Sequence, residues 1–469
     1  MKWSANEVRI LMTILCCMLL NPGILATGQV EPASAKGDGW RLEDGVLLIL
    51  QDNGAEAYRK CRPEDVVLER LVIGEAVSEL GSADMRAKKI EIAPGNDTYS
   101  VCNGILLEQN GKRCVLAQWP LEAAKVPDGV MEIGDHAFFG QTSLRSVTFP
   151  NSLKRIGFSA FEDCVALQQI VFPESLEEVA GFAFWGCTAL ERVDMSQTNI
   201  KSLIDTFGLC ENLREVLLPN TLIRLGDSTF YQCKELSLLR LPDSLKELEG
   251  GALFGCLSLT ALRIPADTRI ILAYEDSFEG WPTLFGGTGV RTVVFAGSAP
   301  QIPIGTFAAY IDGTRRLDAV VERIIFMDKP PAGDSLAAIN VRSIAPQIYY
   351  LDTYAEQWRE STAVLSHGLQ IKQITCAQIN QMLSEDGMQR TSVLPEHAES
   401  DMAPANPELA SPLVKTDFTS STKPPNISNN GKIILFFAVP VVLIIIALVL
   451  FVVSQKRKNI TKSQDGNAI

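Results

Sequence analysis

The sequence predicts a solenoid of stacked β-strand rungs, because several residue types recur at a spacing of 23 residues. Proline occupies one column of this grid, with Ser196 in its single gap, and phenylalanine, leucine and cysteine occupy three more. The columns are Pro127, Pro150, Pro173, Pro219, Pro242 and Pro265; Phe138, Phe161, Phe184, Phe207 and Phe230; Leu144, Leu167, Leu190, Leu213, Leu236 and Leu259; and Cys164, Cys187, Cys210, Cys233 and Cys256. A period in the twenties with leucine at fixed offsets is typical of a leucine-rich-repeat solenoid. We therefore predict a right-handed coil with a parallel β-sheet on its concave side and mostly loops and short turns outside.

Within one repeat, the first residues predict a strand with one buried face. Val147 and Phe149 alternate with Ser146 and Thr148, which is the period-two pattern of such a strand. Pro150 then ends the pairing, because proline has no N–H for the ladder. A single rung cannot bury its apolar edge, so neighbouring rungs must stack. We place six regular repeats at residues 126–265.

Less regular segments flank these repeats. Residues 36–125 carry strand or hairpin patterns at 40–50 and 97–116 and are expected to form an N-terminal cap with degenerate repeats, since terminal repeats must shield the core from water. Residues 266–360 are expected to form irregular repeats and a C-terminal cap. Apolar residues at helical spacing predict a helical segment at residues 361–390.

The start of the chain is typical of a secretory signal peptide. Lys2 and Arg9 precede an apolar stretch from residue 10 to residue 20, and small residues follow it. We expect residues 1–35 to direct export and to be removed. An uncleaved anchor is the alternative.

A second apolar stretch predicts a membrane anchor near the end of the chain. Residues 433–453 form 21 positions without a charge, close to the length of about 20 residues that a membrane helix needs. Lys456, Arg457 and Lys458 follow, which predicts a cytoplasmic tail at residues 454–469. The preceding residues 391–432 contain six prolines and many Ser and Thr, and are expected to form a disordered stalk. The expected location is the cell membrane, single-pass, with the repeats outside.

The cysteines of the grid occupy positions where each repeat needs a small buried group. Free cysteine is among the most buried residue types, so we expect buried thiols there, with disulfides between neighbouring rungs as the alternative. Cys102 and Cys114 flank a predicted hairpin and are the better candidates for a disulfide.

Composition and motifs argue against catalysis and against nucleic acid. The formal net charge is −13, whereas nucleic-acid binding requires clustered Lys and Arg. The three histidines, His136, His367 and His397, are far apart in the sequence, and no Cys or His cluster has metal-ligand spacing. We therefore expect no enzyme, no metal and no cofactor. A hydrolase hidden in residues 300–390 is the alternative.

The repeats resemble a known family. Residues 144–164 read Leu-x-x-Val-x-Phe-Pro-x-x-Leu-x-x-Ile-Gly-x-x-Ala-Phe-x-x-Cys, which is similar to the repeat of the BspA-like leucine-rich-repeat surface proteins. Residues 96–106 resemble that family's hairpin before the repeats, and Tyr349, Tyr350, Tyr354 and Trp358 resemble its closing strand and helix. The resemblance covers residues 40–358. It implies an exported surface protein that binds host or matrix proteins or other cells, and it implies no catalytic residues.

The fourth repeat departs from this pattern. Asn199 stands where the family has a leucine, Leu203 replaces a glycine, and Ser196 replaces the proline. We expect this rung to be distorted.

Side chains of the strands that miss the core are expected to line the concave face and to bind a ligand. The candidate residues are Val171, Arg192, Asp194, Glu215, Leu217, Leu238, Arg240 and Arg263. A strip that mixes apolar and charged residues suits protein recognition. Ordinary solvated sheet decoration is the alternative.

These features together predict a membrane-anchored adhesion protein. Its expected partners are an extracellular protein or cell-surface ligand and, through one helix, the membrane; self-association is a further possibility. A receptor or co-receptor subunit that signals through a membrane partner is the alternative function.

Overall fold

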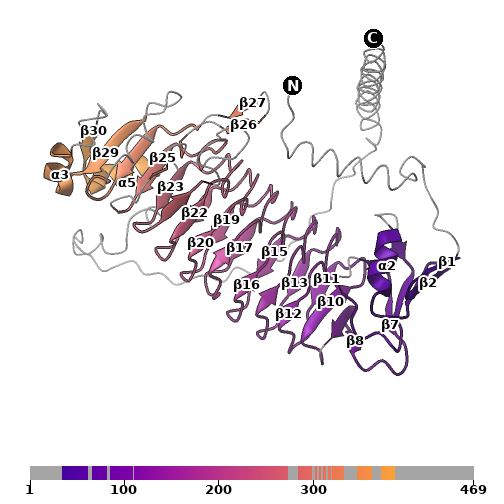
Figure 1. The fold of residues 1–469 in the computed structure, drawn as a ribbon. Coiled ribbons are helices and arrows are strands. Elements are labelled where there is room, and N and C mark those ends of the chain that lie inside the picture. Colours follow the sequence, from indigo (N-terminus) through magenta and orange to yellow (C-terminus); the bar gives the residue numbers. More distant parts are fainter. Residues whose placement is uncertain are drawn as a thin grey trace, which may run out of the picture. The chain divides into compact units, whose positions relative to one another are not determined.

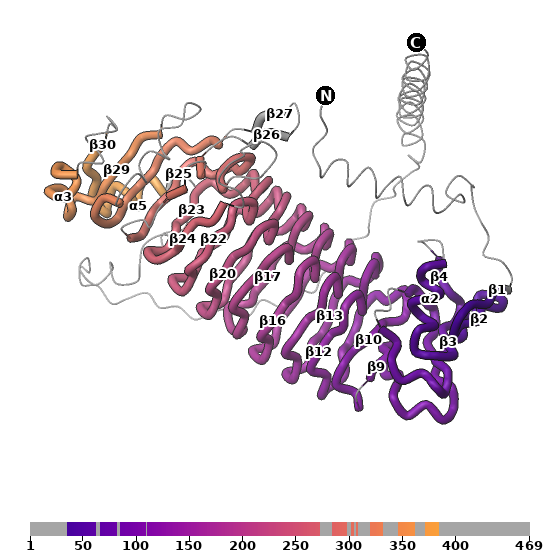
Figure 2. Tube along the Cα trace, in the orientation of Figure 1, coloured from indigo at the N-terminus to yellow at the C-terminus, as the bar shows by residue number. Residues whose placement is uncertain are grey.

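The structure of this protein is a stack of parallel strand rungs, as the ribbon and the Cα tube display (Figure 1 and Figure 2). The chain divides into two units, Met1–Ala403 and Pro404–Ile469, and every element named below belongs to the first. The leucine-rich-repeat solenoid expected from the sequence is confirmed. The computed structural model describes residues 34–61, 66–81, 85–108, 110–272, 284–297, 302–303, 306–307, 310–312, 315–317, 319–331, 346–361 and 371–385.

The N-terminal part forms a sheet with its own core. Its elements are β1 (Ser34–Gly37), β2 (Trp40–Glu43), β3 (Val46–Ile49), α2 (Gly54–Cys61), β4 (Val67–Leu68), β5 (Arg70–Ile73), β6 (Arg86–Ala87) and β7 (Ile90–Ile92). The sheet order is β1-β2-β3-β5-β7, and β3, β5 and β7 run parallel. Trp40 packs edge-on against Tyr58 of α2, with ring centroids 5.1 Å apart, in a core that is separate from that of the repeats.

An antiparallel meander leads from this sheet into the repeats. It consists of β8 (Tyr99–Cys102), β9 (Ile105–Glu108) and β10 (Arg113–Ala117), as expected for residues 97–116. β10 then pairs in parallel with β12 (Glu132–Ile133), a short strand of the first repeat. β14 (Arg155–Ile156) and β16 (Glu178–Val179) continue this sheet, which is here named the second sheet.

The longer ladder of the regular repeats is here named the main sheet. Its strands are β11 (Ala123–Lys125), β13 (Ser146–Thr148), β15 (Gln169–Val171), β17 (Arg192–Asp194), β19 (Glu215–Leu217) and β21 (Leu238–Arg240). They are parallel and in register, so that each residue pairs with the residue 23 positions later, as Val193 does with Val216. The sequence period therefore places equivalent side chains side by side on the sheet.

Two of the sequence columns fill the interior between the sheets. The rings of Phe138, Phe161, Phe184, Phe207 and Phe230 are stacked, and successive centroids lie 4.8–5.9 Å apart. Each cysteine of the grid donates its S–H to a phenylalanine carbonyl of the preceding rung, as from Cys187 Sγ to Phe161 O at 3.2 Å. The buried thiol and the buried phenylalanine ring of each rung thus find their partners in the neighbouring rungs.

The fourth rung is distorted, as expected, and the distortion is a shift by one residue. Ile200 and Leu203 are buried where the consensus predicts positions 199 and 202, and Asn199 is exposed. Leu203 therefore follows Val179 by 24 residues and precedes Leu225 by 22. The second sheet ends at β16, and a new one begins with β18 (Ser202–Leu203), β20 (Arg224–Leu225), β22 (Glu247–Glu249) and β24 (Arg269–Ile271).

A C-terminal sheet continues the stack beyond the regular repeats. It is parallel and contains β23 (Ala261–Ile264), β25 (Thr292–Phe295), β28 (Arg323–Phe326), β29 (Gln347–Leu351) and β30 (Ile371–Ile374). The hairpin β26 (Tyr310–Asp312) and β27 (Arg315–Leu317), the turn η2 (Asp352–Tyr354), and helices α3 (Ala355–Arg359) and α5 (Cys376–Glu385) accompany it.

The segment expected to be helical at residues 361–390 therefore begins, in its described part, with a strand. Ile371 and Ile374 have helical spacing, yet they lie on β30 and pair with β29. The free edge of β29 offers a ladder of hydrogen bonds, and this tertiary pairing overrides the local pattern. The helix begins only at Cys376.

Several expected segments lie outside the described residues. These are the signal sequence up to residue 33, the stalk, the expected membrane segment 433–453 and the tail. Within the described part of the chain, no helix combines the length and the apolar character needed to cross a membrane.

Candidate functional site

The outward side of the main sheet carries two rows of side chains. In-register pairing aligns Gln169, Arg192, Glu215 and Leu238 in one row and Val171, Asp194, Leu217 and Arg240 in the other. All the candidate residues except Arg263 lie in these rows. Sequence reasoning therefore placed them on one surface, here named the strip.

Apolar and charged side chains alternate along the row from Val171 to Arg240. Val171 is 78% exposed, far more than any other large apolar side chain that the structure describes. Leu238 is exposed and Leu217 is half-buried. In their row, Asp194 lies between Val171 and Leu217, and Arg240 follows Leu217. Such mixed surfaces are common in the contact areas of proteins.

Arg192 is held in the middle of the strip by two carboxylates. Its Nε lies 2.8 Å from Glu215 Oε2, and its terminal nitrogen lies 3.4 Å from Asp194 Oδ2. Asp194 Oδ1 also accepts hydrogen bonds from the backbone N–H and the hydroxyl of Ser196 at 3.1 and 2.8 Å. Because these groups are partly exposed to solvent, which screens their charges, the pairs contribute at most about 1 kcal/mol each to stability. Their effect is to fix the direction of the guanidinium group.

Arg240 differs from Arg192 in its surroundings. It is exposed, and it forms no ion pair with any residue that the structure describes. Its charge is therefore available to a carboxylate from outside the chain.

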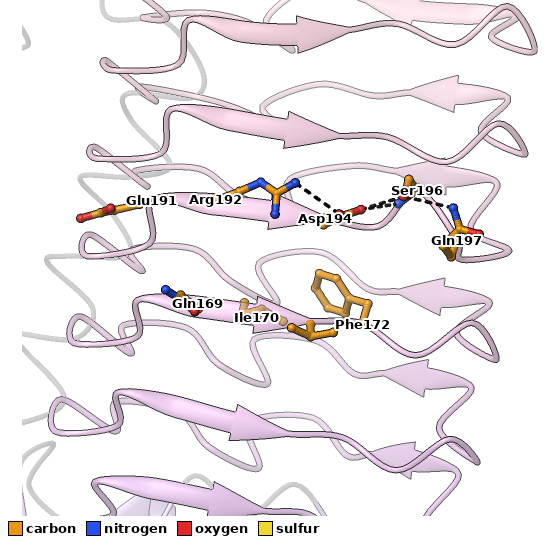
Figure 3. A pocket seen from close by; sticks show the side chains of 9 residues that line it. Gln169, Ile170, Phe172, Glu191, Arg192, Asp194, Ser196 and Gln197 are labelled. Atoms are coloured by element: carbon orange, nitrogen blue, oxygen red, sulfur yellow. Dashed lines mark hydrogen bonds and ion pairs between the residues drawn. The ribbon is translucent and has the colours of Figure 1, made fainter. Parts of the chain in front are cut away.

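A hollow of about 450 Å³ opens between β15 and β17, at one end of the strip (Figure 3). Apolar atoms of Val171, Ile170 and Phe172 line one part of it, and polar groups of Arg192, Asp194 and Gln197 line another. The wall beyond Asp194 is the turn of the shifted fourth rung. There Thr198 binds the carbonyl of Met195 through its N–H at 3.0 Å and its hydroxyl at 2.8 Å. The sequence signal for this hollow was the missing proline at Ser196.

The expectation for Arg263 was wrong. Arg263 is 6% exposed, and its Nη1 pairs with Asp243 Oδ1 at 2.6 Å. Ala261, on the same side of β23, belongs to a buried cluster with Ile379 and Leu383 of α5. The strip therefore ends at β21, because the chain after β30 covers the outward side of the C-terminal sheet.

The second-sheet side is a poorer candidate, because its arginines already have partners. Arg155 joins three rungs by pairing with Glu132 Oε1 at 2.8 Å and Glu178 Oε1 at 3.1 Å. Arg224 pairs with Glu249 of the neighbouring strand β22.

Comparison with known proteins assigns the repeats. Residues 112–207 and 204–281 match the description "BspA type Leucine rich repeat region" in six copies. Residues 112–281 form a BspA-type leucine-rich repeat region. No protein with a curated description matches the chain.

Three solved structures similar to the chain come from bacteria. A leucine-rich repeat protein from Eubacterium ventriosum is 22% identical, with a TM-score of 0.40 over 47% of this chain and 59% of that one. The T. pallidum leucine-rich repeat protein is 26% identical, with a TM-score of 0.32 over 37% of this chain and 82% of its own. The pneumococcal vaccine antigen PcpA is 16% identical, with a TM-score of 0.30 over 60% and 54% of the two chains. The chain thus spans less than two thirds of the length of the E. ventriosum protein.

The cysteines of the BspA-type repeats are free and buried. Burial raises the pKa of the Cys210 thiol to about 12 and raises the pKa of Cys187 well above its ordinary value. These groups stay protonated at neutral pH and are poor nucleophiles. Cys102 and Cys114 are also free; β9 separates their strands, so the expected disulfide between them is wrong.

The histidines form no cluster in the described residues. His136 lies on a turn between two rings, Phe139 and Phe158, while His367 and His397 lie outside the described residues. Among the residues that the structure describes, no group of three or more His, Cys, Asp or Glu side chains could hold a metal ion.

Proposed function

We propose that this chain is a non-catalytic cell-surface protein whose BspA-type repeats bind an extracellular protein or cell-surface ligand through the strip. In this proposal residues 1–35 direct export, residues 433–453 anchor the chain in the membrane, and the role is adhesion. The signal-like and membrane-like segments of the sequence support the location.

The observation that carries the proposal is the hollow beside Val171. Binding energy in protein interfaces concentrates on a few side chains that fill pockets, with polar groups around them. Here an apolar side chain of the ligand would enter between β15 and β17 and contact Val171, while Arg192 and Gln197 stand at its polar side. Arg240 would bind a carboxylate of the same ligand farther along the strip.

The test is a binding screen with the full-length chain, immobilised through a C-terminal tag. It would be exposed to purified extracellular matrix proteins and to whole cells. The double variant Leu217→Asp with Arg240→Glu should weaken saturable binding by about tenfold or more, because it removes an apolar contact and reverses the free cation.

A matched control changes the opposite side of the rungs. Ile223→Asp with Lys201→Glu makes the same two kinds of change at exposed positions that precede β20 and β18. It should bind as the unchanged chain does. Equal losses in the two double variants, or no loss in the first, would contradict the proposal.

The role of the hollow has its own test. Val171→Asp should weaken binding at least as strongly as the double variant, since it places a charge at the apolar wall. Thr148→Asp introduces the same charge at an exposed position of β13 that does not line the hollow, and should have little effect. If the two substitutions weaken binding alike, the hollow is not the anchor.

A further inference from the structure

A line of aromatic rings runs across the turns that follow the second-sheet strands, on a surface separate from the strip. These turns lie between strands such as β14 and β15 and cross the same rungs as the main sheet. We name this line the aromatic ladder; its members are His136, Phe139, Phe158, Phe182, Trp185, Tyr231 and Phe254.

The rings of the ladder touch one another without a break. Phe158 packs edge-on against His136 at 5.7 Å and against Phe182 at 5.4 Å, measured between centroids. Phe182 contacts Trp185 at 5.0 Å, and Trp185 stacks on Tyr231 at 5.8 Å. Tyr231 stacks on Phe254 at 5.4 Å.

A glycine of the fourth rung leaves room for two rings of the ladder to make contact. Trp185 and Tyr231 belong to the third and fifth rungs, and Gly208 stands between them. A Cβ atom at this position would lie 2.0 Å from Cζ3 of Trp185, so any larger residue would displace the indole. The two rings meet because this residue has no side chain.

Two members of the ladder occupy a backbone conformation that does not favour them. Phe182 has φ 57° and His136 has φ 59°, in a column where the sixth rung has Gly251. A bulky residue in the left-handed region is uncommon, and such strain costs about 1–3 kcal/mol and is concentrated at functional sites. Ser159, Asp205 and Ser228 have the same left-handed conformation in this column, so the turn belongs to the repeat, and the rings of His136 and Phe182 are what distinguishes their rungs.

The ladder is half-exposed and not a part of the core. Phe158 is 43% exposed, and His136, Phe139, Phe182, Trp185 and Tyr231 are partly exposed; Phe254 is buried at the end. Exposed aromatic rings that touch one another are typical of interaction surfaces, where Tyr, Trp and Phe are enriched.

Carboxylates accompany the rings. In the repeat register, Glu162 lies between Phe139 and Trp185. Asp205 lies one rung after Phe182, and its carbonyl accepts a hydrogen bond from the Phe182 N–H at 2.8 Å. Asp227 lies on the next rung. Neither Asp205 nor Asp227 forms an ion pair with another residue that the structure describes. Burial raises the pKa of both carboxyl groups, and their mutual repulsion, together with Glu249, raises that of Asp205 further.

We propose that the aromatic ladder is a second interaction surface and that it binds a basic polypeptide segment in which Lys or Arg alternates with apolar residues. The apolar side chains of the segment would pack on the rings of Phe158, Trp185 and Tyr231. Its cations would neutralise Asp205 and Asp227, which have no cation of their own in the described chain. The partner's charge follows from this complementarity, since like charges across an interface are costly.

The test uses short synthetic peptides and the full-length chain in neutral detergent, with empty micelles as the reference. In the first peptide arginine alternates with leucine. In the second, glutamate replaces arginine; in the third, serine replaces leucine. We expect the first peptide to bind saturably and the other two to bind at least about tenfold more weakly.

Variants of the chain locate the binding. Phe158→Ala should weaken binding of the first peptide about tenfold, as expected for a partly exposed aromatic anchor. Phe158→Leu, which keeps an apolar group, should restore part of it. Asp205→Asn with Asp227→Asn should weaken binding and reduce its dependence on salt. Thermal unfolding of each variant checks that the fold is retained.

Matched controls separate a site from the general acidity of the chain. Asp128→Asn with Glu174→Gln removes two carboxylates from turns that follow main-sheet strands, and it should leave binding unchanged. The strip variant Leu217→Asp with Arg240→Glu should also leave it unchanged, so this test is independent of the proposed function. Unchanged binding by Phe158→Ala, or an equal loss with the Asp128 and Glu174 variant, would overturn the proposal.

Discussion

The main sheet and the C-terminal sheet are built from the same kind of parallel strand, yet their outward sides differ. In β13, β15 and β21 the middle residue is buried and its two neighbours are exposed. In β23 and β25 all four residues are buried, because α5 and its neighbours cover them. The repeat thus specifies the rung, whereas the residues at the outward positions decide whether solvent or the chain's own helix covers it.

The largest effect is expected where the interior beneath the main sheet is opened. Phe184 is fully buried between Phe161 and Phe207, and removing a buried phenylalanine ring costs about 3–5 kcal/mol. Phe184→Ala should lower the free energy of unfolding by that amount in denaturant titrations. Ser146→Ala, on the exposed side of β13, should change it by less than about 0.5 kcal/mol. Equal stability of the two variants would refute the repeat register.

The next effect tests the cover of the C-terminal sheet. Ile379 of α5 is fully buried against this sheet, so Ile379→Ala should cost about 2–3 kcal/mol, in the lower part of the range for buried isoleucine. It should also increase the binding of a hydrophobic dye. Lys372→Ala, at an exposed position of β30, serves as the control. A silent Ile379→Ala would mean that the helix is not what buries the outward side of β23.

A smaller effect compares equivalent ion pairs on the two sheets. Asp243→Ala leaves the guanidinium of Arg263 buried without its partner, which should cost about 1–3 kcal/mol. Asp194→Ala leaves Arg192 in water with Glu215 still at hand, and should cost less than about 1 kcal/mol. Chemical denaturation of both variants and of Arg263→Met, which removes the charge itself, would measure the difference. Similar costs for the two aspartates would contradict the burial contrast.

The smallest effect concerns pH and a surface outside both sheets. The pKa of Asp205 is raised in the folded chain by burial and by Asp227 and Glu249. A raised carboxyl pKa favours folding at low pH, and this contribution is lost as pH rises through the folded pKa. Asp205→Asn should therefore raise the melting temperature at neutral pH. The gain should vanish below the ordinary aspartate pKa of 3.8, where the unchanged group is protonated in both states. A stabilisation independent of pH would exclude this electrostatic cause.

Much of the fold was predictable because the columns repeat without insertion over the regular region. The strand positions, the stacked phenylalanines and the buried cysteines follow from one period and from alternation within the strand. The shift of the fourth rung was visible as the loss of proline at Ser196, although its size was not. The one-residue displacement depends on which of Asn199 and Ile200 is buried, and that is decided by packing.

The candidate site was predictable only for strands whose outward side is not covered by a later segment of the chain. The rows from Val171 to Arg240 follow from alternation, but the burial of Arg263 depends on a helix more than a hundred residues later in the sequence. A continuous apolar run such as that of β25 was the available signal that both faces are buried. The aromatic ladder gave only a broken periodic signal. Phe139, Trp185, Tyr231 and Phe254 share one column of the repeat, but Glu162 and Gly208 interrupt that column, and the other members come from two further columns.

The division of the second sheet at the fourth rung has a mechanical consequence. The short strands on that side form two ladders, ending at β16 and starting again at β18, while the main sheet runs past this point from β15 to β17. Solenoid rungs hold together through nearest-neighbour interfaces. At this interface no ladder joins the short strands β16 and β18, so it should yield first. When the two ends of the stack are pulled apart, the rungs should hinge there, with the main sheet as the continuous side. Amide exchange faster at residues 199–203 than at residues 176–179 would mark this hinge in the unloaded protein.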